Sequence, residues 1–382
     1  MGKILIKNGR VWDGEHFFYA DILTNGEFVE KIGTNINAAA AYVYDAFGKI
    51  VSAGLVDAHV HMLVDPSDEY GIQAEMSCFP FGVTAAADAG RKIGNPVILD
   101  SFMLKNVIFI STDIHKNHVD LATLNNIIEH FGNRVVGVKV YFDEKMSEVE
   151  DVTPLREVCE FAKKRNLRVM VHCSNSPVPM SDILSTLNKG DILTHAYHGG
   201  LNNAAEDNFE SIKLAQKRGV IIDAGFAGNV HTNFGVFKRA LANNALPDTI
   251  STDITKFSAY VRGGRYGMTM CMNLARCEGM KEEDIFRAVT SNPAKALGKE
   301  EKWGYLKEGR IADIAVFDYV EESFSLSDNE GNHVGSKKGY RCILTISDGQ
   351  IVYKDWLLNY YHLKLRGGFL VKKLVCIETN KF

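Results

Sequence analysis

The chain of 382 residues contains 46% hydrophobic and 24% charged residues and carries a formal net charge of −4. This composition is typical of a soluble globular protein without a polybasic face, so we expect small molecules, and neither nucleic acid nor a membrane, as partners. The N-terminus has no apolar core of signal-peptide length, and no run of about 18 apolar residues occurs, so we expect a cytoplasmic location.

The two ends of the chain contain short runs that are punctuated by Gly and Asp and alternate apolar with polar residues. Examples are ILIKNGRVWDG near the N-terminus, and IADIAVFD and CILTISDGQIVY near the C-terminus. Such runs are typical of antiparallel strands. We predict that the two ends together form one small β-sandwich domain, composed of residues 1–52 and 304–362.

Between these ends, short β-branched runs alternate with amphipathic segments such as 154–166 and 206–219, whose apolar positions fall three and four apart. Eight such units predict the α/β class, with a (β/α)8 TIM barrel over residues 53–303 and reactive residues at the C-terminal ends of its strands. The predicted strands are Ile50–Ala58, Gly82–Ala87, Asn106–Ile110, Val135–Phe142, Arg168–His172, Asp191–His195, Val220–Ala224 and Thr249–Thr252.

Residues 363–382 are expected to form a C-terminal extension. The stretch that leads into it begins WLLNYYHLKLR at residue 356 and is rich in apolar and aromatic residues. Such a composition favours docking on the body of the protein, or a subunit contact, over a free tail.

The most specific local motif is GLVDAHVHM, which places His59 and His61 at the end of the first predicted barrel strand. Residues two apart on a strand project from the same face, so both imidazoles can reach one metal ion. Alone, this motif is weak, because a histidine at a strand end is more often simply hydrogen-bonded or solvated.

Three further candidate ligands lie at the ends of other predicted strands. His172 ends the fifth run, His195 the sixth, and Asp253 follows the eighth. Taken singly, His195 could be a hydrogen-bonded core histidine and Asp253 a helix N-cap. Because a barrel delivers all these strand ends to one rim, the set as a whole predicts a metal site.

Lys139 lies in the apolar run GVKVYF, where an isolated ammonium group is costly to bury. A neutral lysine can react with carbon dioxide to form a carbamate, and two metal ions could each bind one oxygen of that anion. The alternative is a lysine whose stem is buried while its head reaches the rim or pairs with an acid.

These residues resemble the amidohydrolase superfamily, specifically the binuclear branch that contains dihydroorotase, dihydropyrimidinase and N-acyl-amino-acid deacylases. The resemblance covers nearly the whole chain. Besides the candidate ligands, it includes the phrases GKIVSAGLVDAHVHM, FGVTAAADAG, AVTSNPAKALG and GYLKEGRIADIAVFD. The resemblance supports the predicted barrel with a flanking sandwich and implies a homo-oligomer.

The resemblance also implies the ligand set. His59, His61 and Asp253 would hold the more buried of two divalent metal ions, and His172 and His195 the more exposed one. Carboxylated Lys139 and a hydroxide would bridge them. Zinc is the usual metal, with manganese, iron or cobalt as alternatives. Asp253 would take the proton of the attacking hydroxide and pass it to the leaving group, which suits hydrolysis of an amide, a cyclic amide or an ester.

The substrate is less defined. Dihydroorotases usually continue HxHxR, with the arginine holding a carboxylate, whereas His61 here is followed by Met62 and Leu63. The phrases GVKVYF, THAYHGG and STDIT are closer to dihydroorotase-like deacetylases. We therefore expect hydrolysis of a small acylated carboxylic acid, either an N-acyl amino acid or an acetylated 2-hydroxy acid.

Tyr141 and Arg265 are the predicted substrate-binding residues. Other rim candidates, among them Ser174 and His231, have no sequence feature that ranks them higher. A cyclic amidase of the dihydroorotase or hydantoinase type is the alternative function. A non-catalytic scaffold is a remote one, because all six ligand positions are filled. The exact substrate, stereospecificity, native metal and subunit number stay open.

Overall fold

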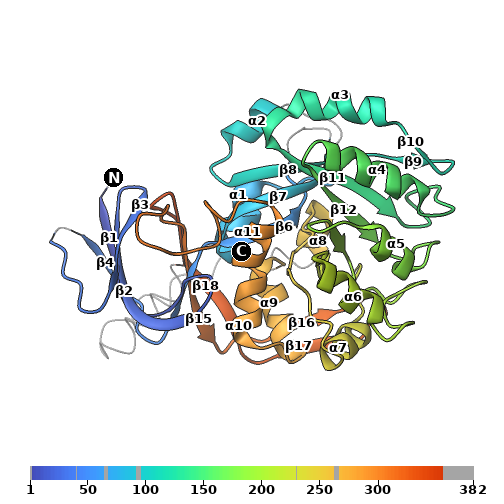
Figure 1. The fold of residues 1–382 in the computed structure, drawn as a ribbon. Helices are drawn as coiled ribbons and strands as arrows, with labels where there is room; N and C mark the ends of the chain where they lie inside the picture. The colour runs from blue at the N-terminus through green and yellow to red at the C-terminus, as the bar shows by residue number, and fades with distance from the viewer. Residues whose placement is uncertain are drawn as a thin grey trace, which may run out of the picture.

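The computed structural model describes residues 2–39, 41–63, 68–91, 96–228, 230–261 and 266–355. Two parts are visible in Figure 1: a sheet built from both ends of the chain, and a barrel formed by the residues between them. The predicted extension 363–382 and the predicted substrate residue Arg265 lie outside the described residues.

The strands from both chain ends join in one mixed sheet, ordered β19-β18-β15-β5-β1-β2-β3, with β4 also paired to β1. The two ends meet where β5 runs antiparallel to β15. This arrangement confirms a separate domain built from both ends. The strands are β1 (Lys3–Trp12), β2 (Phe17–Asn25), β3 (Phe28–Gly33), β4 (Tyr42–Asp45), β5 (Ile50–Ala53), β15 (Ile314–Val320), β18 (Gly339–Ser347) and β19 (Gln350–Lys354).

The expected antiparallel pairing holds for only part of this sheet. β4 and β5 run parallel to β1. After β3, the connecting chain crosses back so that both strands run in the same direction as β1. A parallel neighbour always needs such a crossover. The apolar core of the domain includes Ile6, Val11, Ile22, Val51 and Val316.

The barrel contains seven parallel strands in sequential order from β6 to β14. They are β6 (Leu55–Val60), β7 (Val83–Arg91), β8 (Lys105–Ser111), β11 (Val135–Phe142), β12 (Arg168–Cys173), β13 (Ile192–Thr194) and β14 (Ile221–Ile222). Residues 249–254 occupy the eighth place without forming a regular strand. Isolated bridges join Asp223 to Thr249 on one side and Val60 to Ile254 on the other, so this segment closes the predicted barrel.

The first predicted run, Ile50–Ala58, is two strands in the structure. β5 belongs to the mixed sheet and β6 to the barrel, with Gly54 between them. The chain changes sheets here because Gly54 donates its N–H to the carbonyl of Asp313 and packs closely on Thr84, whose Oγ1 would lie 2.1 Å from a Cβ.

The helices lie outside the strands of the barrel (Figure 1), and the segments predicted at 154–166 and 206–219 contain α4 and α6. In α4, buried Leu155, Val158 and Ala162 share the inward face. The α-helices are α1 (Ala74–Cys78), α2 (Pro96–Ser101), α3 (Leu121–Phe131), α4 (Thr153–Lys164), α5 (Met180–Thr186), α6 (Glu210–Arg218), α7 (Phe234–Ala242), α8 (Lys256–Val261), α9 (Met268–Cys277), α10 (Glu282–Ala288) and α11 (Ser291–Ala296).

Several short elements complete the fold. The 3-10 turns η1 (Phe79–Phe81) and η2 (Gly132–Arg134) precede β7 and β11, and two small hairpins are formed by β9 (Ile114–His115) with β10 (His118–Val119) and by β16 (Phe324–Ser327) with β17 (His333–Ser336).

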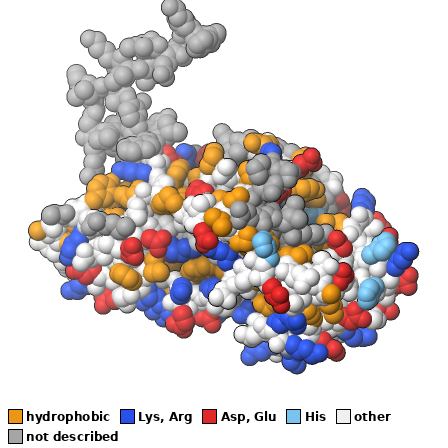
Figure 2. All heavy atoms as spheres, turned by 90° about the horizontal axis from the view of Figure 1, so that it is seen from above, with side chains coloured by type: hydrophobic (Ala, Val, Ile, Leu, Met, Phe, Trp, Pro, Cys, Tyr) orange, Lys and Arg blue, Asp and Glu red, His pale blue; other side chains and the backbone are white. Residues whose placement is uncertain are grey.

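On the face shown in Figure 2, basic and acidic side chains are intermingled. Within the described part of the chain, no helix is both long and apolar enough to cross a membrane.

Candidate metal centre

Five of the six predicted ligands, all except His195, line one pocket at the C-terminal ends of the barrel strands. The pocket has a volume of about 970 Å³, and His59, Lys139, His172 and Asp253 are among the residues that line it. This is the face of a TIM barrel on which active sites are found. The sequence therefore placed these side chains correctly in the fold, and their role as ligands stays a prediction.

The first cluster consists of His59, His61 and Asp253. The Nε2 atoms of His59 and His61 lie 3.1 Å and 3.0 Å from the same oxygen, Oδ1 of Asp253. The segment carrying Asp253 is held beside β6, because the N–H of Asp253 donates to the carbonyl of His59 at 2.7 Å. Asp253 has a left-handed backbone, with φ of 47°, a conformation that non-glycine residues rarely adopt outside constrained sites.

The orientation of His59 is fixed by buried residues behind it. Thr194 Oγ1 lies 3.1 Å from Nδ1 of His59 and donates its hydrogen to Oδ2 of Asp223 at 2.7 Å. The hydroxyl must then accept the proton of Nδ1, so Nε2 of His59 keeps its lone pair for the pocket. Carboxylate-linked arrangements of this kind commonly set the tautomer of a metal-binding histidine.

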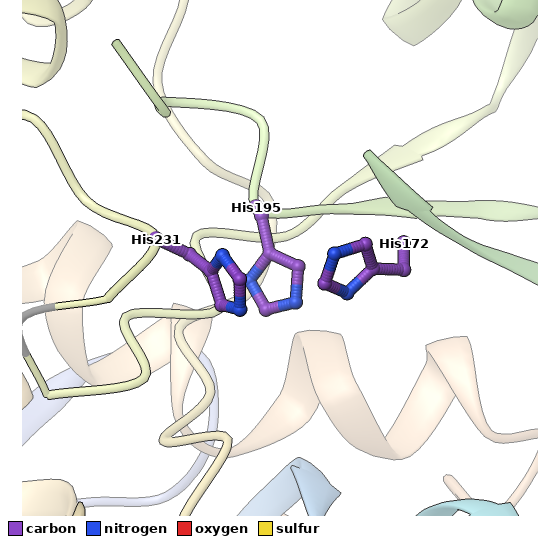
Figure 3. A group of neighbouring side chains, drawn as sticks. All are labelled: His172, His195 and His231. Carbon is purple, nitrogen blue, oxygen red and sulfur yellow. The ribbon is translucent and has the colours of Figure 1, made fainter. Parts of the chain in front are cut away.

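The second cluster contains His172, His195 and His231, whose rings face one another in Figure 3. One ligand nitrogen from each lies within 4.8 Å of the others. Nδ1 of His195 donates to the carbonyl of Gly225 at 2.6 Å, which leaves Nε2 as the acceptor atom. The buried Nε2 atoms of His172 and His195 form no hydrogen bond with the described residues, and carboxylate oxygens of Asp143 and Asp253 lie 3.6 Å and 3.7 Å from them, respectively.

Lys139 is buried, with only 1% of its surface exposed. Its Nζ lies 3.1 Å from Nε2 of His59 and 3.3 Å from Sδ of Met170. Among the described residues, no carboxylate forms an ion pair with this ammonium group within 4.0 Å. The head of Lys139 therefore neither reaches solvent nor pairs directly with a described acid.

The environment of these side chains favours the protonation states in which they can bind a metal ion. Burial lowers the pKa of His59 and of His172 to about 3, and lowers that of Lys139 to about 8. Burial alone would raise the pKa of Asp253, but His59 and His61 more than offset this and hold it well below its usual range. The imidazoles of His59 and His172 are thus neutral and the carboxylate of Asp253 is charged, as metal binding requires.

These properties fit a site for divalent metal ions. Neutral imidazole nitrogens and a carboxylate are the donor set that zinc and similar ions prefer. Two of the buried nitrogens, Nε2 of His172 and of His195, have no hydrogen-bond partner in the described part of the chain. Buried polar groups are rarely left unsatisfied in folded proteins. A metal ion would satisfy them.

Of the two predicted substrate-binding residues, the structure places Tyr141 in the pocket, whereas Arg265 lies outside the described residues. Tyr141 lines the pocket, with its ring 5.5 Å from that of His172, and its hydroxyl approaches Gly90 so closely that a Cβ there would lie 2.5 Å away. Ser174 and His231, which the sequence named as rim candidates without ranking them higher, also line the pocket. Asn329 was not predicted, because it comes from a distant hairpin that the sequence does not connect with the barrel.

The fold is a TIM barrel with a pocket lined by candidate metal ligands, and the sequence matches the profile of the amidohydrolase family over residues 50–352. The chain belongs to this family. A deacetylase of Enterococcus faecalis is 29% identical over 381 residues, covering 91% of this chain and 98% of the relative. A dihydroorotase of Streptococcus thermophilus is 24% identical over 433 residues, covering 92% of this chain and all of the relative.

Solved structures share the fold. A dihydroorotase superposes with a TM-score of 0.82 at 22% identity, covering 93% of this chain and 100% of the other. An adenine deaminase gives 0.79 at 24% identity, covering 92% and 99%. The family and its relatives identify this chain as a hydrolase of C–N bonds, and they confirm the predicted resemblance.

Proposed function

We propose that this chain is a binuclear metal-dependent deacylase that cleaves the amide or ester bond of a small acylated carboxylic acid, either an N-acyl amino acid or an acetylated 2-hydroxy acid. The observation that carries the proposal is that two ligand clusters lie beside a buried lysine, Lys139, which forms no direct ion pair with a described carboxylate. The deacetylase names of similar proteins from Enterococcus faecalis and Agrobacterium fabrum support removal of an acetyl group.

In this proposal, His59, His61 and Asp253 hold one metal ion, His172 and His195 hold the second, and Lys139 bridges them as a carbamate. Zinc suits this donor set, and manganese, iron and cobalt are the alternatives. When bound, such ions supply a water molecule of lowered pKa and polarise a carbonyl group.

The side chains of the pocket would perform the remaining tasks. Asp253 accepts a proton from the attacking water and returns it to the leaving nitrogen or oxygen. Tyr141 orients the substrate from the pocket wall, where its ring packs beside His172. Arg265, which lies outside the described residues, pairs with the substrate carboxylate.

Ring opening by a cyclic amidase is the second candidate, and the dihydroorotase relatives favour it. At the position where the HxHxR motif has its arginine, this chain has Leu63. An arginine that would hold a dihydroorotate carboxylate is therefore missing from that position. We place this function second for that reason.

A substrate panel separates the two candidates. We would measure kcat/KM for both enantiomers of N-acetyl amino acids and acetylated 2-hydroxy acids, and for dihydroorotate and hydantoins. The proposal predicts hydrolysis of at least one acyl compound at a higher kcat/KM than any ring compound. Efficient ring opening without activity on any acyl compound would overturn it.

The bridging role of Lys139 is tested by Lys139→Ala. Because loss of even an outer partner of a metal ligand costs about 10–100-fold, removal of a bridging ligand should lower activity at least that much. Short carboxylic acids should restore part of it by replacing the carbamate. Protein equilibrated with carbon-13 bicarbonate should show a carbamate signal by NMR that this variant lacks.

Lys145→Ala is the matched control, because Lys145 lines the same pocket but is exposed. It should keep both the carbamate signal and the metal content measured by mass spectrometry. A Lys139→Ala protein that retains two metal ions and full activity would refute the bridge.

A further inference from the structure

Residues 321–338 form an excursion from the mixed sheet. β15 and β18 pair directly with each other, from Ile314 with Ile346 to Val320 with Gly339, and the intervening chain leaves the sheet as the β16–β17 hairpin. In Figure 1 this hairpin lies beside α7, on the barrel. A segment of the sheet domain thus reaches the part of the barrel that carries His231.

The turn of the hairpin is attached to the barrel by Asp328, which is buried, with only 2% of its surface exposed. Its Oδ2 accepts the N–H of Phe234 at 3.0 Å, at the beginning of α7, and also accepts from Asn332 Nδ2. Its Oδ1 accepts the N–H groups of Glu330 and Asn332. One carboxylate therefore both shapes the turn and attaches it to α7.

A second attachment involves the next residue. The N–H of Asn329 donates to the carbonyl of Thr232 at 3.2 Å, in the loop that presents His231. Asn329 lines the pocket, and the other described lining residues all lie between 59 and 258. Its carboxamide is exposed and forms no hydrogen bond with the described residues, so a donor and an acceptor are available to a ligand.

The position of Asn329 determines which part of a substrate it can meet. The reacting carbonyl must lie at the two ligand clusters, and an acetyl group extends from it by only one methyl. The other half of the substrate, which leaves as the amine or alcohol, is then the part long enough to approach the pocket wall formed by His231 and Asn329.

We propose that Asn329 is a specificity-determining residue that hydrogen-bonds a polar substituent on the leaving half of the substrate, and that Asp328 is its positioning residue. This inference rests on the proposed function. It assigns the β16–β17 hairpin a role in substrate selection, although the hairpin belongs in sequence to the sheet domain.

The test compares N-acetylserine with N-acetylalanine, in the enantiomer that the wild type hydrolyses, because the two differ by one hydroxyl. Asn329→Ala should lower the ratio of their kcat/KM values by about fivefold to tenfold, which corresponds to one lost hydrogen bond. The loss should appear mainly in KM for the serine compound. The alanine compound should change by less than about twofold.

Glu330→Ala is the matched control, because Glu330 is exposed in the same turn. It should leave the ratio unchanged. Asp328→Ala should lower the ratio as Asn329→Ala does, and Asp328→Asn should restore part of it by keeping an acceptor oxygen. If Asp328→Ala does not fold, the ratio measured with Asp328→Asn should lie between those of the wild type and Asn329→Ala.

A ratio that changes by less than about twofold in Asn329→Ala would overturn the inference while leaving the proposed deacylase intact. If the wild type hydrolyses no acyl compound of the substrate panel, the proposed function fails instead, and the same variants are compared on the hydantoins of serine and alanine. Equal ratios in wild type and Asn329→Ala on that pair would also overturn the role of Asn329.

Discussion

At the scale of single residues, two buried side chains behind His59, those of Thr194 and Asp223, fix the orientation of its ring. Asp223 accepts hydrogen bonds from Thr194 at 2.7 Å, from Thr249 at 2.7 Å and from Ser251 at 2.6 Å. This carboxylate is fully buried, so its three donors hold it in place. Thr194 transmits that fixed geometry to His59.

Thr194→Val should weaken metal binding. Valine has nearly the same shape but cannot accept the proton of Nδ1, so the tautomer of His59 is no longer fixed. We expect zinc affinity to fall by about 10–100-fold. A competition titration with a fluorescent chelator measures this change directly in the purified protein.

Thr186→Val provides the control for this prediction. Thr186 donates to the carbonyl of Asp182 within α5, on the surface of the protein. It should bind zinc as the wild type does. Unchanged zinc affinity in Thr194→Val would show that the hydroxyl does not orient His59.

The sequence predicted the residues of the pocket better than the contacts behind them. His59 and His61 could be assigned to one face because strand periodicity requires it. The role of Thr194 could not be predicted, because it depends on the side chains of three different segments meeting in the barrel interior. His231 had only its place after the seventh strand, which does not reveal that its ring lies 4.2 Å from that of His195.

At the scale of elements, the junction between β5 and β6 joins the two parts of the molecule. Gly54 packs so closely on Thr84 that a Cβ would lie 2.1 Å from Oγ1 and 2.8 Å from Cγ2. Its N–H also donates to the carbonyl of Asp313, which precedes β15. The chain can change sheets here because glycine has no side chain to displace these neighbours.

Gly54→Ala should destabilise the protein by about 1–3 kcal/mol, because Thr84 is buried and cannot move away without disturbing the core. The midpoint of urea unfolding measures the change. The double variant Gly54→Ala with Thr84→Ala should recover part of it, because the contacting atoms are then removed.

Gly33→Ala is the comparison, since no heavy atom lies within 4 Å of a Cβ at Gly33 and its φ is not positive. It should change stability by less than about 0.5 kcal/mol. Equal effects of the two substitutions would mean that the close packing at Gly54 is not what the junction requires.

The sequence showed the apolar character of residues 50–58 but not the break within them. Both β5 and β6 are buried, so the run reads as one continuous strand, and only tertiary packing against Thr84 and Asp313 divides it. Residues 249–252 were likewise predicted as a strand, although the sheet contacts of this segment are reduced to isolated bridges.

At the scale of the whole molecule, closure of the barrel and assembly of the first ligand cluster involve the same contacts. Val60 forms a bridge with Ile254, and the preceding residue, Asp253, places its carboxylate beside His59 and His61. A metal ion held by these three side chains would join the first strand of the barrel to its last segment.

Removal of metal should therefore loosen the barrel at its closure. A ligand that binds only the folded state at about 100 times its Kd adds roughly 2.7 kcal/mol of stability, so the apo protein should melt at a lower temperature than the zinc-loaded protein. Hydrogen exchange measured by mass spectrometry should be faster in residues 249–254 of the apo protein, with little change in α3.

Addition of magnesium in place of zinc controls for ionic strength, because magnesium prefers oxygen ligands over imidazoles. It should neither raise the melting temperature nor slow exchange in residues 249–254. Zinc protection spread evenly over all helices, or absent from the closing segment, would contradict this link between metal binding and closure.

The pairing of β5 with β15, which joins Ala53 to Ile314, has a consequence for biosynthesis. The ribosome makes β5 early but supplies its partner only after the complete barrel sequence has been translated. Until then, one edge of β5 is open, and such an edge can pair with another nascent chain. The sheet that is begun first is therefore completed last, and chains truncated before residue 314 should be prone to aggregate.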